Sequence, residues 1–277
     1  MSVEVARGGS RLDLPEIEWV RRHLEEHVVG ATIRAVEVVT PRLFPGKPRA
    51  EIVDRLLNGT LHGVGRHGRT LVLQVGAERL ALPVQGVAYL AFGTGTPPAD
   101  LRLALEFADR GRLWYGAPAG IIHASLSDSD SKVLSPGVEP LSSAFSLANF
   151  KRILSRKKRT THALLVDDEL LAGIGGLYAD EILFAARVRP TRVIPALKAD
   201  DVRHLYYAIL EVLQKAARFG GVSSEDFALV EGRSGSFGRF LTVHGQTGAP
   251  CQVCRAQIRC TTTSDARTWF CPRCQRE

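Results

Sequence analysis

Two kinds of segment are missing from this sequence. It contains no run of about 18 apolar residues, the shortest length that commonly spans a membrane as a helix, so we expect no membrane span. Its first residues, MSVEVARGGS, lack the apolar core of a secretory signal. We therefore expect a cytoplasmic protein.

Cysteine is absent from most of the chain, because all five cysteines lie in the last 27 residues. This clustering excludes a disulfide framework spread through the fold and favours a local metal site. The tail reads CQVC, sixteen intervening residues, then CPRC. Two CxxC pairs at this spacing predict one structural Zn²⁺ held tetrahedrally. The predicted ligands are Cys251, Cys254, Cys271 and Cys274, and Cys260 is left as a spare thiol.

Negative charge is in short supply, since 29 Asp and Glu stand against 36 Lys and Arg, for a net charge of +7. A basic balance favours an anionic partner, most often nucleic acid, although a basic enzyme without such a partner has the same composition. The segment KRILSRKKR (151–159) holds six cations and no acid. We interpret it, with Lys157 and Lys158, as a phosphate-contacting segment.

The hydrophobic pattern changes along the chain and predicts an α+β fold. Near the start, apolar residues recur at helical spacing before a glycine stop, at Ile17, Val20, Leu24, Val28 and Gly30. From 31 to about 115 the pattern alternates with period two, as in LRLALEF, and predicts strands. A Ser-, Pro- and Gly-rich linker follows, and the next hundred residues look helical.

A glycine turn joins two of these helices in LLAGIGGLYADEILF. Glycines at this turn let the backbone approach a ligand closely, and the N–H groups that open the next helix can bind a phosphate oxygen. The predicted contacts are the backbones of Gly175, Gly176 and Tyr178. Alone, GIGG is a weak signal and is equally typical of a tight corner.

Five stretches, taken together and in order, carry a resemblance to a known family. They are LPEIEWVRRHLEEHVVG, LSPGVEPL, LLVDDELLAGIGGLYADEILFAARVRP, FGGVSSEDF and CQVC…CPRCQ. They resemble the formamidopyrimidine-DNA glycosylase and endonuclease VIII (Fpg/Nei) family over nearly the whole chain. The resemblance implies an N-terminal extension (1–11), a β-sandwich domain with a helix (12–122), a linker (123–144), a helix–two-turn–helix domain (145–235) and a zinc finger hairpin (236–277).

The resemblance also implies a reaction, and the sequence departs from it at the key position. Members of the family flip out a damaged base, and an N-terminal proline amine attacks the sugar while a neighbouring glutamate handles protons. Aligned on LPEIE, the proline position is Leu12 and the glutamate is Asp13. Eleven residues precede Leu12, so its nitrogen is an amide. Pro15 and Glu16 then read as the start of a helix.

Further positions implied by the resemblance are also altered. The family's hairpin lysine aligns with Arg69, its space-filling methionine with Val87, and its arginine–phenylalanine wedge with APAGII (117–122). Its phosphate-binding asparagine aligns with Gly176 and its lysine before the glycine turn with His162.

The zinc-finger arginine of the family aligns with Ala266, although Arg267 stands next to it. On a strand, a shift of one residue turns a side chain to the other face. The DNA contacts that we expect are Arg69, Lys157, Lys158, His162, Gly175, Gly176, Tyr178, Arg267 and Arg273.

These observations favour a monomeric, nucleoid-associated protein that binds damaged or distorted double-stranded DNA, with base excision and abasic-site lyase activity impaired or lost. A second hypothesis is an active glycosylase and lyase for oxidised purines, in which Asp13 or Glu16 activates water or another amine attacks. A third is a zinc-finger protein that binds RNA or another protein.

One further motif, HLEEH (23–27), fits the H-x-x-E-H pattern of some zinc proteases. On a helix, Glu26 points away from the apolar stripe and His27 flanks it. We interpret these as surface residues rather than a protease site.

Overall fold

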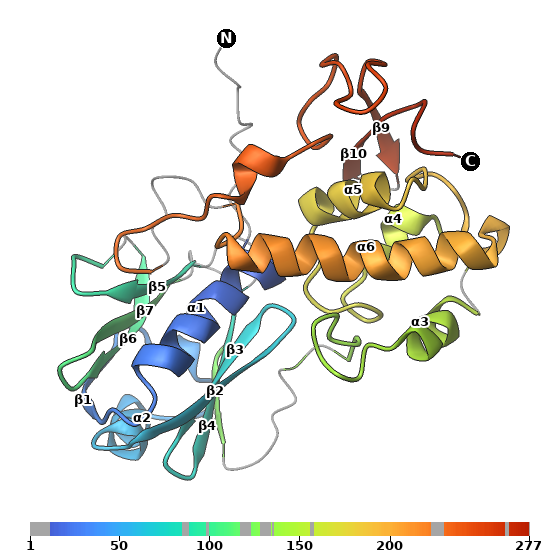
Figure 1. Cartoon of the computed structure of the whole chain (residues 1–277). Coiled ribbons are helices and arrows are strands. Elements are labelled where there is room, and N and C mark those ends of the chain that lie inside the picture. Colours follow the sequence, from blue (N-terminus) through green and yellow to red (C-terminus); the bar gives the residue numbers. More distant parts are fainter. Residues whose placement is uncertain are drawn as a thin grey trace. The chain divides into compact units, whose positions relative to one another are not determined.

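The computed structural model describes residues 12–84, 89–97, 100–116, 123–127, 134, 136–155, 158–222, 230–263 and 266–276. The chain divides into two compact units (Figure 1). The β unit runs up to Leu134 and also takes in Ala217–Ser236. The helical unit is made of Ser135–Ala216 and Phe237–Glu277. Within the described ranges, no helix is long and apolar enough to cross a membrane.

Helix α1 (Leu14–His27) opens the β unit and follows the predicted pattern. Pro15 occupies its first turn, where the missing N–H costs no hydrogen bond. The side chains of Ile17, Val20 and Leu24 are completely buried, so the apolar stripe faces the core. Just after the helix, Gly30 adopts a φ of +90°, a conformation that glycine tolerates best. The helix predicted from the spacing is confirmed.

Two antiparallel sheets form the body of the β unit, as the alternating pattern predicted. One has the order β1-β6-β7-β5, and the other has the order β2-β3-β4-β8. Their bounds are β1 (Ile33–Val38), β2 (Leu61–His67), β3 (Thr70–Val75), β4 (Glu78–Pro83), β5 (Tyr89–Gly93), β6 (Leu101–Phe107), β7 (Gly111–Gly116) and β8 (Ser125–Ser127). Helix α1 contacts β2 and β3 of one sheet and β5 of the other.

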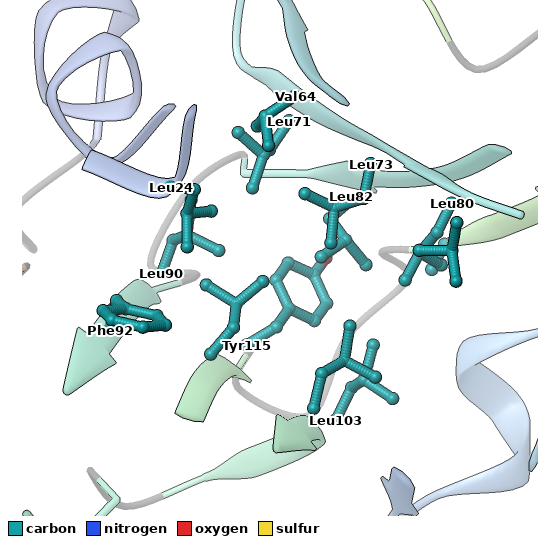
Figure 2. Packing of buried hydrophobic residues seen from close by; sticks show 14 of the residues in the cluster. Leu24, Val64, Leu71, Leu73, Leu80, Leu82, Leu90, Phe92, Leu103 and Tyr115 are labelled. Atoms are coloured by element: carbon teal, nitrogen blue, oxygen red, sulfur yellow. The ribbon is translucent and has the colours of Figure 1, made fainter. Parts of the chain in front are cut away.

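The core lies between the sheets (Figure 2). Leu71, Leu73 and Leu82 of one sheet point toward Leu103 and Tyr115 of the other. The Tyr115 hydroxyl donates to the Pro83 carbonyl at 2.6 Å, so the buried phenol is satisfied and joins the two sheets. Each buried leucine side chain contributes about 1.5–3 kcal/mol through removal of apolar surface from water. The sandwich is therefore held mainly by these apolar contacts.

Two features of the β unit differ from the expected pattern. A short helix, α2 (Arg49–Leu56), interrupts the strands after a 3-10 turn, η1 (Pro41–Leu43). Ile52 and Leu56 are one helical turn apart and completely buried, which supplies the packing that stabilises α2. Strand β8 lies inside the segment expected to be a linker, because Leu126 is buried where β8 pairs with β4.

The segment Ala217–Ser236 belongs to the β unit, although we expected it with the helical domain. Val230 pairs in parallel with Phe92 on the edge of β5, and the Glu231 N–H donates to the Phe92 carbonyl at 2.6 Å. These backbone contacts extend the edge of the sheet. Local sequence patterns do not reveal them, because Phe92 and Val230 lie far apart in the sequence.

The helical unit follows the remainder of the predicted order. Its elements are α3 (Leu147–Leu154), α4 (Thr161–Leu165), α5 (Gly176–Ala185), η2 (Ile194–Ala196), α6 (Ala199–Arg218), η3 (Phe237–Phe240), β9 (Arg259–Thr263) and β10 (Ala266–Phe270). Helix α5 packs on α4 and on β10 of the terminal hairpin. The predicted α+β fold is thus confirmed, with a sandwich, a helical region and a cysteine-bearing hairpin (Figure 1).

Candidate functional site

Leu12, at the start of the β unit, is part of the hydrophobic core. Its side chain is 2% exposed and packs in the same cluster as the apolar stripe of α1. Its backbone nitrogen lies in a peptide bond with Arg11 and has no basic lone pair. The residue at this position is therefore built for packing.

Asp13 and Glu16 cap helix α1. The Asp13 N–H donates to Oε2 of Glu16 at 3.0 Å, which satisfies a donor at the helix start. Oδ1 of Asp13 accepts a hydrogen bond from Nε of Arg69 at 2.8 Å. Both carboxylates are buried, Asp13 at 6% and Glu16 at 1% exposure. The two acids that could handle protons thus also hold the helix end in place.

Arg69 lies in the two-residue turn between β2 and β3, where Gly68 has a φ of +54°. Its side chain is 15% exposed and forms an ion pair with Asp13. The predicted phosphate contact at Arg69 stays a prediction, and the structure places this guanidinium beside an acid.

The second oxygen of Glu16 reaches a segment distant in sequence. Oε1 accepts from the Val222 N–H at 2.7 Å. A Cβ built on Gly221 would lie 2.2 Å from the same oxygen, and Gly221 has a φ of +74°. Only glycine fits this approach without a shift. The glycine pair in FGGVSSEDF therefore seats the segment after α6 against the start of α1.

Farther along α1, Glu18 forms ion pairs with three arginines. Its carboxylate accepts from Arg21, Arg22 and Arg66 at 2.8–3.1 Å. Burial alone would raise the pKa of Glu18, but the hydrogen bonds and positive charges of Arg21, Arg66 and Arg22 together outweigh burial and lower this pKa below its usual value. Arg66 is directed to this acid and to the Gly68 carbonyl at 3.2 Å. The network fixes β2 against α1.

In the helical unit, the predicted glycine turn precedes α5 as expected. Gly175 is the N-cap residue with an extended backbone, and α5 begins at Gly176. The first N–H groups of a helix lack intrahelical acceptors and carry the positive end of the helix dipole. Gly176 and Leu177 are partly exposed, whereas the Tyr178 side chain is 1% exposed. The predicted phosphate contact at this backbone stays a prediction.

His162 lies beneath this turn and is 1% exposed. Its Nδ1 shares a hydrogen bond with Oγ1 of Thr263 at 3.1 Å, and its Nε2 lies 3.9 Å from Asp180 without a hydrogen-bond partner among the described residues. Burial lowers the pKa of His162, against the opposing charge of Asp180. The expected direct phosphate contact by this imidazole does not fit its buried position. His162 instead supports the turn from inside.

The basic segment is described only in part. Lys158 and Arg159 are exposed, and Arg159 forms an ion pair with Asp167. Lys157 lies outside the described residues, as do Val87 and the wedge segment 117–122. Of the predicted contacts Lys157 and Lys158, Lys158 is the one that the structure describes, and it is exposed, as are Lys151 and Arg152 of the same segment.

The four predicted ligand cysteines come together at the terminal hairpin. Their sulfur atoms lie within 4.8 Å of one another, with Cys251–Cys274 at 3.8 Å and Cys254–Cys271 at 3.4 Å. Four Zn–S bonds of about 2.3 Å in a tetrahedron separate the sulfurs by about 3.8 Å, so the donor set fits such a metal. A backbone hydrogen bond from Ala256 lowers the pKa of Cys254 to about 7, whereas burial raises the pKa of Cys271 and the pKa of Cys274. The clustering predicted from the spacing is confirmed.

Beside the cluster, the hairpin strands present arginines. Arg267 is exposed on β10, with its guanidinium 5.1 Å from the centre of the Trp269 ring, and Arg273 is exposed between two of the cysteines. The neighbouring Thr268 is fully buried and donates to Asp180. The alternation along β10 therefore turns Arg267 outward.

Asp180 and Glu181, an acidic pair on α5, were not predicted from the sequence. Oδ2 of Asp180 lies 2.7 Å from Nδ1 of His244, and Glu181 accepts backbone hydrogen bonds from Thr242, Val243 and His244 at 2.9–3.1 Å. Two acids inside an otherwise apolar helix segment, YADEILF, were the available signal. They join α5 to the segment that leads into the cysteine cluster.

Comparisons with known proteins agree with this arrangement. Residues 12–119 match the model of the formamidopyrimidine-DNA glycosylase N-terminal domain, and residues 136–228 match that of the formamidopyrimidine-DNA glycosylase H2TH domain. The chain is 34% identical over 275 residues to the Formamidopyrimidine-DNA glycosylase of Heliobacterium modesticaldum, covering 95% of this chain and 99% of that protein. The corresponding protein of Enterococcus faecalis is 31% identical, with 95% and 96% covered.

Solved structures give the same answer. The Lactococcus lactis Fpg in complex with an abasic site containing DNA superposes with a TM-score of 0.83 at 29% identity. The match covers 96% of this chain and all of the other. A complex of the same protein with DNA containing THF and an inhibitor superposes with a TM-score of 0.84 at the same identity and coverage. Because two of the family's domain models match along this chain and a relative that is 34% identical covers 95% of it, this chain belongs to the formamidopyrimidine-DNA glycosylase family.

Proposed function

We propose that this protein binds damaged or distorted duplex DNA and does not form the Schiff base that the family's N-terminal proline makes. The observation that carries the second half is Leu12, an internal residue that is 2% exposed. An amide nitrogen is not a nucleophile, since its lone pair is delocalised into the carbonyl. An imine therefore cannot form at position 12, because no free amine is present there.

Binding is supported by the relatives and by the chemistry of the helical unit. The Lactococcus lactis Fpg structures hold DNA with an abasic site or with Fapy-dG. Here the exposed cations Lys158, Arg267 and Arg273 and the N-terminus of α5 offer phosphate contacts. The proposed phosphate contacts include the backbone at Gly175–Tyr178 and exclude the buried imidazole of His162.

One structural zinc ion belongs to the same proposal. Cys251, Cys254, Cys271 and Cys274 would hold it with four thiolates, and its chemistry is to fix the hairpin rather than to react. The ion would hold β9 and β10 together and so fix the position of Arg267 on β10. Removal of the ion by a chelator is expected to unfold the hairpin.

An active enzyme is the second candidate, and the names of the relatives favour it. Proteins that are 30–34% identical over 95% or more of this chain are named Formamidopyrimidine-DNA glycosylase. In that case Asp13, which follows position 12 and pairs with Arg69, is the candidate general base for a water. Glu16 is the less suitable base because both of its oxygens accept backbone hydrogen bonds.

Borohydride trapping tests the proposal. The native protein is incubated with duplexes that carry 8-oxoguanine, formamidopyrimidine or an abasic site, and covalent adducts and released base are measured together with binding. We expect tighter binding to the abasic duplex than to undamaged duplex, and neither adduct nor base release. The matched control starts at position 12 after an initiator Met and carries Leu12→Pro and Asp13→Glu, which restores the amine.

Each outcome decides between the candidates. An adduct with the native protein shows a working amine and refutes the proposal. Base release without an adduct shows hydrolysis by an activated water and favours the second candidate. Equal affinity for damaged, undamaged and RNA duplexes contradicts the proposed recognition of damage.

A further inference from the structure

Two cations of the helical unit lie over one aromatic ring. Phe240 ends η3, and its ring centre lies 4.3 Å from Nζ of Lys215 on α6 and 4.9 Å from Cζ of Arg239. The largest separation that these distances allow between the two positive charges is about 9 Å. Attraction to the negative face of the ring offsets part of their mutual repulsion. We call Lys215, Arg239 and Phe240 the cation–aromatic patch, and all of it belongs to the helical unit.

Lys215 lies over this ring although an acid stands one helical turn before it. Glu211 precedes Lys215 by four residues on α6, the spacing and the order that favour an ion pair on a helix. Among the described residues, neither of these two side chains forms an ion pair, and both are exposed. The ammonium group of Lys215 is therefore accessible to an anion from solution.

The ring that carries the cations is held against α5. Two residues after Phe240, the N–H and the hydroxyl of Thr242 donate to the buried carboxylate of Glu181, the N–H at 2.9 Å. At the start of η3, the buried ring of Phe237 packs on Tyr178 of α5 with ring centroids 5.9 Å apart. Phe240 itself is partly exposed, and its ring centroid lies 6.0 Å from that of Phe237. The ring is positioned before any ligand binds, which lowers the entropy cost of binding.

The same row of aromatic rings leads from the patch to the glycine turn. Tyr178 is the third residue of α5, and side chains on a helix lean toward its N-terminus. The two centroid distances place the rings of Tyr178 and Phe240 at most about 12 Å apart. One DNA strand advances by about 3.4 Å per nucleotide, so about four nucleotides span this distance. A strand with a phosphate at the turn can therefore also reach the patch.

The charges in this part of the helical unit favour a polyanion. The N-terminus of α5 carries the positive end of the helix dipole, and Lys215 and Arg239 add two formal positive charges. The acids of α5, Asp180 and Glu181, are buried and accept hydrogen bonds from the protein itself. Glu211 is the exposed acid closest to Lys215 along α6, and its single charge leaves the surface net positive. A phosphate backbone offers negative charges at the regular, short spacing that matches two separate positive points.

We propose that Lys215, held over Phe240 beside Arg239, binds the phosphate backbone of a DNA strand within about four nucleotides of the phosphate at the α5 turn. The inference rests on the proposed DNA binding, and it adds a second point at which the helical unit contacts the same strand. Phosphate contacts carry no base information, so the patch raises the affinity for damaged and undamaged duplexes equally.

A salt series with the full-length, zinc-loaded protein tests the patch. Binding to a labelled abasic duplex and to the matching undamaged duplex is measured by fluorescence anisotropy. Lys215→Gln is expected to weaken binding to both duplexes by the same factor and to reduce the slope of log K against log salt by about 1. Phe240→Leu keeps every charge but removes the aromatic ring, so we expect about two- to fivefold weaker binding, with folding checked by circular dichroism.

Lys198→Gln is the matched control. It removes the same charge from an exposed lysine of the helical unit just before α6 begins. Lys198 lies about 25 Å from Lys215 along the helix, at about 1.5 Å per residue, and we expect the salt slope of this variant to equal that of the native protein.

Neutral methylphosphonate linkages, placed one at a time along each strand, locate the contact. The native protein is expected to lose affinity at the linkage that meets the patch, and this loss should disappear in Lys215→Gln while the losses at other linkages remain. A methylphosphonate profile that Lys215→Gln leaves unchanged overturns the proposal.

The salt series gives two further results that overturn the proposal. One is an equal slope for the native protein and Lys215→Gln, and the other is an equal reduction in Lys215→Gln and Lys198→Gln. Equal affinity of the native protein for damaged and undamaged duplexes refutes the proposed recognition of damage instead, because the patch is expected to contact both. A native protein that binds no duplex refutes both proposals.

Discussion

Among the described residues of the helical unit, the Glu181 carboxylate makes most of the hydrogen bonds between α5 and the segment 242–244 that precedes the cysteine cluster. Replacing Glu181 by glutamine tests whether these hydrogen bonds hold the segment in place. Glu181 is 5% exposed and accepts the N–H groups of Thr242, Val243 and His244 at 2.9–3.1 Å, together with the hydroxyl of Thr242. Glutamine keeps the size but replaces one acceptor oxygen by an NH₂ group that faces donors.

The magnitude follows from the number of donors involved. A hydrogen bond to a charged group contributes about 1.5–3 kcal/mol, and a buried donor left without an acceptor costs about 1–3 kcal/mol. The Thr242 N–H lies within hydrogen-bond distance of both carboxylate oxygens, so in Glu181→Gln it loses one of its two acceptors and faces the NH₂ group instead. All three backbone N–H groups lose the negative charge of their acceptor. We therefore expect about 3 kcal/mol less stability for this contact, which corresponds to roughly 100-fold faster amide exchange at 242–244.

Hydrogen exchange read by mass spectrometry is the suitable assay, because it reports the local contact in a protein of two units whose global unfolding need not be two-state. Glu211→Gln is the matched control, as Glu211 is exposed on α6 of the same unit. Equal exchange at 242–244 in the two variants would show that the carboxylate does not hold this segment, and would refute the reasoning.

Three further outcomes are expected. Gly221→Ala should lower the free energy of unfolding by about 1–3 kcal/mol more than Gly46→Ala does. Both glycines have φ near +75°, but only the new Cβ at Gly221 would overlap the Glu16 carboxylate. Equal losses of the two variants in urea denaturation would contradict this contact. The pKa of His162 is lowered in the folded state, so the unfolded state binds the proton first as pH falls below about 6.5. Between pH 7.5 and 5.5, the free energy of unfolding of the native protein should therefore fall by up to about 1.4 kcal/mol more than that of His162→Gln. An equal fall for both proteins in urea denaturation would exclude this linkage. Lys158→Gln should weaken binding to all duplexes and reduce the slope of log K against log salt by about 1, and an unchanged slope would remove Lys158 from the interface.

Local patterns predicted much of the fold. The buried stripe of α1 follows from spacing alone, because four residues at helical intervals must share a face. The cysteine cluster follows from ligand spacing in the same way. Helix α2 was missed although Ile52 and Leu56 are four residues apart, since a helix of only eight residues within a β-rich region gives a weak periodic signal.

The direction of polar side chains could not be read from the sequence. Alignment suggested that His162 faces phosphates, but packing buries it against Thr263, and nothing in the local sequence indicated that Arg69 pairs with Asp13. Such orientations depend on partners 56 and 101 residues away, which local patterns do not contain. For the same reason, no local pattern indicated that Glu231 lies beside His23, since 208 residues separate them.

Because Ala217–Ser236 completes the β unit, the order of synthesis constrains how the chain folds. When Leu134 leaves the ribosome, the edge of β5 beyond Phe92 still waits for Val230 and Glu231, and Glu16 waits for Val222. At about 5–20 residues per second, the missing segment arrives roughly 5–20 s later. During that interval an unpaired strand edge is open to wrong partners. The β unit can therefore complete its sheet edge only after residues 222–231 have left the ribosome.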